Sequence, residues 1–154
     1  VNLAQVKNND LLLDPFCGTG SIIIEAGEIG VRSIGIDISR RMCNGTLKNL
    51  KHFDTFGSGI VHSDVAQVPL LRVDGVATDI PYGRASSTHK RKTESLAEDL
   101  IANLEILLPA GRQACIVHPD TIDILDVGGL ERVQQHIIPV NRSLTRMITI
   151  LKRV

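Results

Sequence analysis

The sequence predicts an α/β domain built on a parallel β-sheet with helices on both faces. Short apolar runs bounded by Gly, Asp or Pro alternate with segments of helical periodicity, which is the pattern of strand-helix-strand units. Near the C-terminus two strand-like segments follow each other with no room for a crossover helix, so the sheet is predicted to end in an antiparallel hairpin. With 154 residues, 43% of them hydrophobic, the chain can bury one core, and we expect residues 1–154 to form one domain.

The predicted strands are apolar runs short enough to be buried on both faces of a sheet. They cover residues 11–13, 33–36, 59–62, 75–78 and 114–117. The terminal hairpin is predicted from residues 132–140 and 145–152, with its turn at 141–143.

The clearest predicted helix has an apolar stripe with a spacing of three to four residues. Ser95 with Glu98 three residues later resembles a capping box at its start, and Pro109 marks its end. The stripe consists of Leu96, Leu100, Ile101, Leu104, Leu107 and Leu108.

Two more helices are predicted, at residues 39–50 and 21–29. The first begins with Ser39 as a plausible N-cap and carries Cys43, Leu47 and Leu50 on one face. The second contains three consecutive isoleucines, which favour a strand by propensity, but the glycine-rich turn before them favours a helix.

The composition of the chain argues against several kinds of protein. Basic and acidic side chains balance at 17 each, so no overall charge attracts the domain to nucleic acid or to an anionic membrane. The three cysteines lie at wide spacings, the five histidines show no metal-ligand spacing, and no apolar run is as long as a membrane span. We therefore expect a metal-independent protein of the reducing cytoplasm, with no membrane contact.

A glycine-rich turn follows the first predicted strand, in Asp14-Pro15-Phe16-Cys17-Gly18-Thr19-Gly20. Gly18 and Gly20 allow a tight bend and a close approach of a ligand to the backbone. The dinucleotide fingerprint needs a third glycine and the phosphate loop needs a Gly-Lys-Ser/Thr ending, and both are missing here. S-adenosylmethionine carries an ammonium and a sulfonium but no phosphate, so the Asp14 carboxylate suits this cofactor better than a pyrophosphate. We expect Asp14, Phe16, Gly18 and Gly20 to contact it.

Acidic residues also follow the second and third predicted strands. Asp37 is placed to accept the two ribose hydroxyls of an adenosine cofactor, and Asp64 could accept the adenine amino group. Ile38 and Val65 would bracket the adenine ring. A turn role for Asp64 is nearly as good an explanation when that residue is taken alone.

The fourth predicted strand ends in Asp79-Ile80-Pro81-Tyr82-Gly83. An exocyclic base amine is a poor nucleophile, so methyl transfer to it needs acceptors for its N–H bonds, which Asp79 and a neighbouring backbone carbonyl can supply. A carboxylate in a dry pocket also stabilises the positive charge that grows on the nitrogen. Pro81 restricts Ile80 to an extended conformation, and Tyr82 offers a face on which a base can stack. These four residues, Asp79 to Tyr82, are the predicted catalytic residues.

The two signatures together resemble those of the class I S-adenosylmethionine-dependent amino-methyltransferases, and most of all the tRNA guanine-N2 methyltransferases that modify guanosine 10. Residues 141–146 also look like that family, whereas Ile80 departs from its commoner Asp-Pro-Pro-Tyr form. The resemblance implies a Rossmann-like seven-stranded sheet of order 3-2-1-4-5-7-6 whose last strand is antiparallel. It implies that Asp14, Asp37 and Asp64 hold the cofactor and that Asp79 to Tyr82 hold the base.

The same resemblance implies an N-terminal RNA-binding domain, of the THUMP type, that is absent from this chain. The chain would then be a catalytic fragment, with tRNA held mainly by the missing part. Arg84, His89, Lys90, Arg91 and Lys92 could add a local phosphate contact, or form only a solvated loop.

Three other functions remain open at this point: methylation of ribosomal RNA guanine or DNA adenine, an inactive cofactor-binding module that interacts with RNA, and an NAD-dependent oxidoreductase. The oligomeric state does not follow from the sequence.

Overall fold

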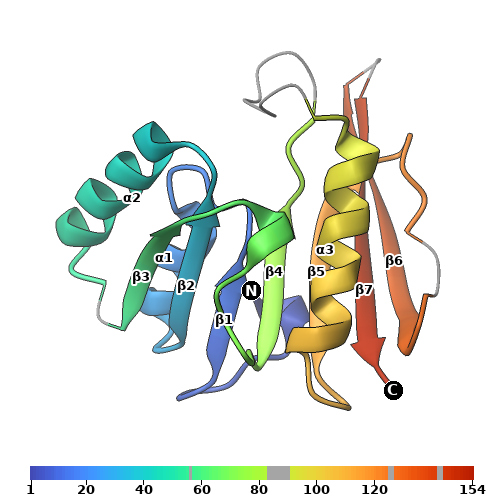
Figure 1. The fold of residues 1–154 in the computed structure, drawn as a ribbon, viewed down its shortest axis with the longest axis horizontal. Helices are drawn as coiled ribbons and strands as arrows, with labels where there is room; N and C mark the ends of the chain where they lie inside the picture. The colour runs from blue at the N-terminus through green and yellow to red at the C-terminus, as the bar shows by residue number, and fades with distance from the viewer. Residues whose placement is uncertain (56, 83–90, 125–126, 142–143) are drawn as a thin grey trace.

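The computed structural model describes residues 1–55, 57–82, 91–124, 127–141 and 144–154. Within them the chain forms a sheet of seven strands in the order β3-β2-β1-β4-β5-β7-β6 (Figure 1). The strands are β1 (Leu11–Asp14), β2 (Arg32–Asp37), β3 (Ser58–His62), β4 (Gly75–Asp79), β5 (Gln113–Pro119), β6 (Leu130–Asn141) and β7 (Leu144–Arg153). The predicted fold class and strand order are confirmed.

The β1 to β5 strands pair in parallel, whereas β7 runs antiparallel to both β5 and β6. The carboxyl ends of β1, β2 and β4 therefore meet at one edge of the sheet, which is where α/β proteins bind ligands. The helices are η1 (Asn2–Ala4), α1 (Ser21–Glu28), α2 (Arg40–His52), η2 (Val65–Gln67) and α3 (Thr93–Leu107).

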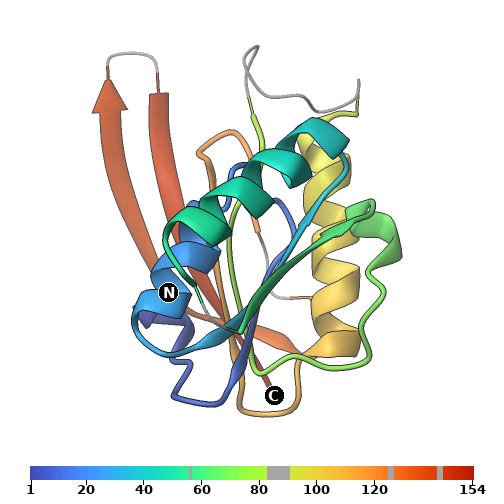
Figure 2. The same cartoon turned by 90° about the vertical axis from the view of Figure 1, so that its left-hand side faces the viewer.

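Helices cover both faces of the sheet, α1 and α2 on one side and α3 on the other (Figure 2). Neighbouring residues of a strand point to opposite faces, so Leu13 joins the core under α3 while Leu12 packs on the other side with Ala26 of α1. The α3 side holds the larger core, and the apolar stripe predicted for this helix lies against it.

Two details of the predicted helices are wrong. α3 begins at Thr93, so Ser95 lies inside the helix and its hydroxyl accepts a hydrogen bond from Arg91 instead of capping the end. On α2 the buried positions are Cys43, Thr46 and Leu50, while Leu47 is 53% exposed. Ser39 caps α2 as predicted, since its hydroxyl accepts from the Met42 backbone N–H at 3.5 Å.

The β6–β7 hairpin extends the sheet at the edge opposite β3, and one end of it projects beyond the body of the molecule (Figure 2). In its register, Arg146 of β7 lies opposite Pro119, the last residue of β5. The start of β7 is therefore close to the edge where the parallel strands end.

Candidate active site at the carboxyl edge of the sheet

The turn after β1 depends on its glycines. Gly18 and Gly20 have φ angles of 53° and 92°, in the left-handed region that favours glycine. A Cβ atom at Gly20 would also lie 2.8 Å from Thr46 Cγ2. Gly20 thus lets α1 begin close against α2. The Gly18 N–H donates to Asp37 Oδ2 and its carbonyl accepts from Thr46 Oγ1, so this turn is tied to both neighbouring segments.

Asp14, the last residue of β1, is 1% exposed. Its Oδ1 accepts hydrogen bonds from Thr78 Oγ1 at 2.6 Å and from the Phe16 backbone N–H at 3.2 Å. Burial raises the pKa of Asp14 to about 7; the two hydrogen bonds oppose this rise and the nearby charges of Asp79 and Asp37 add to it. A bound cation would stabilise the ionised form of this carboxyl.

Asp37 joins the end of β2 to the same turn. Its Oδ2 accepts from the Gly18 backbone N–H at 3.0 Å, and its Oδ1 accepts from the Ser39 N–H at 2.7 Å. A carboxylate oxygen can accept more than one hydrogen bond, so both oxygens keep capacity for ligand hydroxyls.

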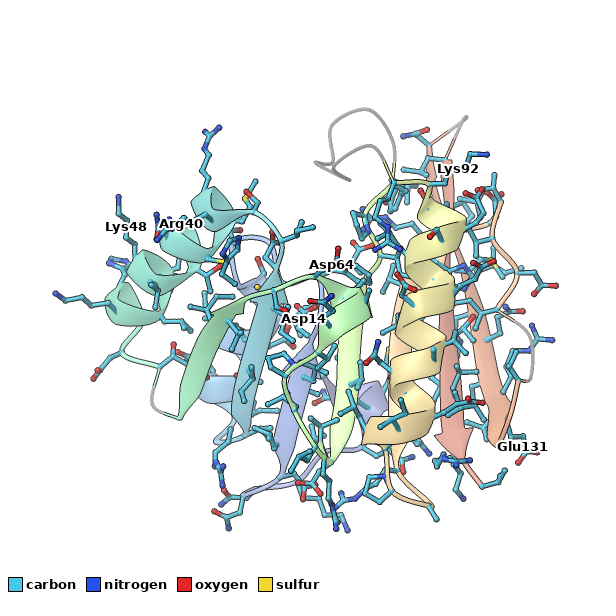
Figure 3. The ribbon with its side chains drawn as sticks, in the orientation of Figure 1. Asp14, Arg40, Lys48, Asp64, Lys92 and Glu131 are labelled. Carbon is cyan, nitrogen blue, oxygen red and sulfur yellow. The ribbon has the colours of Figure 1, made fainter. Side chains whose placement is uncertain are left out.

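Asp64 lies at the next strand end, and Figure 3 shows it with Asp14 toward the upper end of the sheet, far from Glu131. Its Oδ1 accepts from the Ala66 backbone N–H at 2.9 Å and pairs with Arg91 at 3.0 Å. Asp64 therefore caps η2 in this structure, which is the turn role considered above, and a contact with adenine stays a prediction.

The side chains predicted to bracket adenine differ in exposure. Val65 is 4% exposed and packs in the core under α3, while Ile38 is half-buried at the start of the loop after β2. Their role also stays a prediction.

Of the basic segment that could contact phosphate, the structure describes Arg91 and Lys92, and Lys92 is exposed. Arg91 forms ion pairs with both Asp64 and Asp99, so its charge is already matched. Arg84, His89 and Lys90 lie outside the described residues.

The predicted catalytic loop follows β4. The Ile80 side chain is fully buried in the core and its N–H donates to the Val117 carbonyl at 2.9 Å, which fixes the backbone of the loop. The Ile80 side chain thus belongs to the core, and its N–H makes a hydrogen bond that the commoner proline could not make.

Asp79 differs from the other acids of this edge because its hydrogen-bonding capacity is unused. No donor among the described residues reaches its buried Oδ1, and its Oδ2 lies 3.6 Å from Arg146 Nη1. Burial raises the pKa of Asp79, while the Arg146 charge lowers it. The role of Asp79 as an acceptor for the N–H bonds of a ligand stays a prediction.

A cavity of about 380 Å³ connects the β1 turn with the β4 loop. Asp14 and Gly18 line one side, and Asp79 and Tyr82 line the other. The structure brings together most of the predicted residues; Asp37 adjoins the cavity through its bond to Gly18, whereas Gly20, Ile38, Asp64 and Val65 are not among its lining. The full lining is Asp14, Phe16, Cys17, Gly18, Thr19, Ser21, Ile22, Asp79, Ile80, Pro81 and Tyr82.

Sequence reasoning missed two site residues. Thr78 was only part of an apolar run, although a hydroxyl one residue before Asp79 in a fully buried strand is a signal of a buried polar partner. Arg146 donates a hydrogen bond from Nε to Tyr82 Oη, and its guanidinium lies 5.4 Å from the Tyr82 ring centroid. Its only sequence signal was its place in the hairpin segment that resembles the methyltransferases.

Sequence relatives support the resemblance. The chain is 39% identical to the tRNA (guanine(10)-N2)-dimethyltransferase of Methanothermobacter thermautotrophicus, over 100% of this chain and 47% of that protein. It is 35% identical to the enzyme of the same name from Methanocaldococcus jannaschii, over 100% of this chain and 44% of that protein. The chain thus spans about half the length of these curated relatives.

A solved structure supports the fold. TrmN from Thermus thermophilus superimposes with a TM-score of 0.81, covering 99% of this chain and 46% of that one, at 17% identity. No helix among the described residues has the length and apolar character needed to cross a membrane. The sequence pattern of the RMKL-like methyltransferase domain matches residues 1–147, and the chain belongs to that family.

Proposed function

We propose that this domain transfers a methyl group from S-adenosylmethionine to the exocyclic N2 amine of a guanosine in tRNA. The observation that carries the proposal is the position of Asp79, whose carboxylate has an oxygen without a donor among the described residues and lines the same cavity as Asp14 and Gly18. The methyl donor and the amine that accepts the methyl group can therefore meet in one cavity.

The residues present fit S-adenosylmethionine. Asp14 is a buried acid with a pKa of about 7, and a cationic ligand beside it would stabilise its ionised form. Gly18, with a φ of 53°, makes the tight turn next to it. Asp37 supports the turn and keeps acceptor capacity for ribose hydroxyls. When bound, the cofactor supplies a methyl group on a positively charged sulfur, and its departure leaves a neutral thioether.

In this proposal, Asp79 to Tyr82 bind the guanine base that receives the methyl group. The N2 lone pair of guanine is delocalised into the ring, so Asp79 and the loop carbonyls must draw the N–H bonds into position and localise that pair. As a bond forms between nitrogen and the methyl carbon, the nitrogen becomes positive and the carboxylate stabilises it. The nitrogen then loses one proton, which Asp79 is placed to hold or to pass to water.

The substrate assignment rests on the relatives, which are named for guanosine 10 of tRNA. A paired or stacked base must swing out to enter the cavity, so we expect selection by RNA shape. Because positive and negative side chains balance in this chain, most of the RNA affinity is expected from another part of the protein.

The expected location is the cytoplasm. Cys17, Cys43 and Cys115 are buried, unpaired thiols, which suits a reducing compartment.

The test is methyl transfer from radiolabelled S-adenosylmethionine by the full-length protein to unmodified tRNA, ribosomal RNA and duplex DNA, followed by nucleoside analysis. Labelled N2-methylguanosine or N2,N2-dimethylguanosine from tRNA is the expected product. Labelled N6-methyladenine from DNA would show that the substrate is DNA and not tRNA. Guanine methylation confined to ribosomal RNA would show that the substrate is ribosomal RNA. Cofactor binding without transfer to any of the three would support an inactive module instead.

A further inference from the structure

Arg146 connects the terminal hairpin to the acceptor loop. It lies on β7, opposite Pro119 of β5, and its side chain reaches Tyr82 and Asp79. Its Nε donates to the Tyr82 hydroxyl, its guanidinium carbon is 5.4 Å from the ring centroid, and its Nη1 is 3.6 Å from Asp79 Oδ2. One side chain thus contacts both the carboxylate and the aromatic ring of the loop.

Asp79 is only partly buried, with a side chain that is 40% exposed. Its Oδ1 is buried, and the Asp14 carboxyl lines the same cavity. Burial opposes ionisation of a carboxyl and raises the pKa of Asp79, whereas a guanidinium favours ionisation. Among the described residues, Arg146 is the opposite charge that acts on Asp79.

The other titratable groups near Asp79 do not replace Arg146. Tyr82 and Cys17 line the cavity but carry no positive charge. His118 of β5 lies beside the strand partner of Asp79, but its ring nitrogens are engaged by Thr149 Oγ1 at 2.8 Å and the Pro119 carbonyl at 3.0 Å.

We propose that Arg146 is a positioning residue of the acceptor site, which keeps the Asp79 carboxylate charged and holds the Tyr82 ring in place. The inference rests on the proposed methyl transfer and adds to it a role for the hairpin. An ionised Asp79 accepts N–H bonds from the amine and stabilises the positive nitrogen. A protonated Asp79 would present an O–H donor and would lack the charge that the transition state needs.

Two substitutions separate the two parts of this role. Arg146→Gln removes the charge but keeps an N–H group that can donate to the Tyr82 hydroxyl. Arg146→Lys keeps a charge but lacks the planar guanidinium that stacks on an aromatic ring. Lys152→Gln is a matched control, because Lys152 lies on the same strand near its far end, opposite Gln113.

The experiment measures single-turnover methyl transfer by the full-length protein from pH 5 to 8.5 at several tRNA concentrations. In Arg146→Gln, the acid limb of the maximal rate should move to higher pH, because the positive charge that favours ionised Asp79 is lost. Arg146→Lys should keep the acid limb and raise KM for tRNA, and Lys152→Gln should match the wild type.

Titration of the Asp79 carboxyl by carbon NMR, assigned with Asp79→Asn, gives a readout that does not need activity. Its midpoint should rise in Arg146→Gln and stay near the wild-type value in Arg146→Lys. If neither the acid limb nor the carboxyl midpoint moves in Arg146→Gln, the inference is wrong. If the wild type transfers no methyl to tRNA but the midpoint moves, the proposed function fails while the link between Arg146 and Asp79 stands.

Should Arg146→Gln fail to fold, as judged by thermal melting, Arg146→Met gives the same loss of charge with a side chain that can pack.

Discussion

The two sides of the cavity are stabilised in different ways. On the cofactor side, Asp14 and Asp37 accept hydrogen bonds from backbone N–H groups and from Thr78, all within the parallel part of the sheet. On the acceptor side, Asp79 has one oxygen with no donor among the described residues, and its other oxygen lies 3.6 Å from Arg146 of the hairpin.

This difference implies that cofactor binding and the rate of methyl transfer depend on different residues. Carboxylates that accept several backbone N–H bonds are held in one orientation, which suits a fixed cofactor. A carboxylate with spare capacity can instead respond to charge that develops during the reaction. We therefore expect substitutions on the cofactor side to change mainly affinity, and substitutions on the acceptor side to change mainly rate.

The largest effect is expected for Asp79→Asn. Loss of the charge should lower the single-turnover rate by about 10²- to 10³-fold, the range seen when one stabilising group is removed from a transition state. The dissociation constant for S-adenosylmethionine, measured by calorimetry, should stay within about twofold of the wild type if the two sides act separately. Asp120→Asn, at an exposed position after β5, is the control. If Asp79→Asn weakened cofactor binding and left the rate of transfer unchanged, Asp79 would act on the cofactor side, which contradicts this comparison.

Tyr82→Ala is expected to have the next largest effect. Base stacking on an aromatic ring is worth about 1–3 kcal/mol, so loss of the ring should lower kcat/KM for tRNA by roughly 5- to 150-fold. Tyr82→Phe keeps the ring and loses only the hydroxyl that accepts from Arg146, so it should lose less activity. Equal losses in the two variants would mean that the hydroxyl, not the ring, is what matters.

Gly20→Ala tests the cofactor side. A methyl group at this position meets Thr46 Cγ2 at 2.8 Å in a backbone with a φ of 92°, a strain of about 1–3 kcal/mol. We expect weaker cofactor binding, by about tenfold, together with a lower melting temperature. Gly59→Ala is the matched control, since a Cβ there meets nothing within 4 Å. Loss of transfer in Gly20→Ala at saturating cofactor would contradict the separation of the two sides.

The smallest effect is a pH dependence that comes from Asp14. Its pKa is raised from 3.8 to about 7, so in the folded protein without ligand it holds a proton that the unfolded chain loses. Its contribution to stability therefore decreases as pH rises from 3.8 toward 7. A cationic cofactor favours the ionised form, so affinity for S-adenosylmethionine should rise several-fold between pH 6 and pH 8, a change of about 1 kcal/mol.

Asp14→Asn should remove this pH dependence from both the melting temperature and the affinity. Calorimetry in buffers of different ionisation enthalpy should also detect proton release on binding to the wild type and less release with the variant. The same pH dependence in both proteins would assign it to another group.

The architecture followed from the sequence because its signals are local and repeated. Apolar runs ending in acids predicted the strands and their shared edge, and a short connection between two strand-like segments required the antiparallel hairpin. The wrong details were also local. Ser95 resembles a cap, but α3 begins at Thr93 and Arg91 uses the Ser95 hydroxyl.

The contacts between distant segments were not predictable in this way. Thr78 and Asp14 are separated by 64 residues, as are Arg146 and Tyr82, and no sequence spacing indicates these contacts. The acids themselves were found from sequence, because each follows its own apolar run. The cation that acts on Asp79 was not, because its position depends on how the hairpin pairs with β5.

A crystal structure of the protein with S-adenosylhomocysteine is the most direct test of the claim that one cavity serves donor and acceptor. The account predicts that the methionine end lies beside Asp14 and Gly18, with the sulfur facing Asp79 across a gap that fits a methyl group and an amine. Reacting atoms about 3–3.5 Å apart would have to be accommodated in that gap. A ligand bound with its sulfur directed away from Asp79, or outside this cavity, would contradict it.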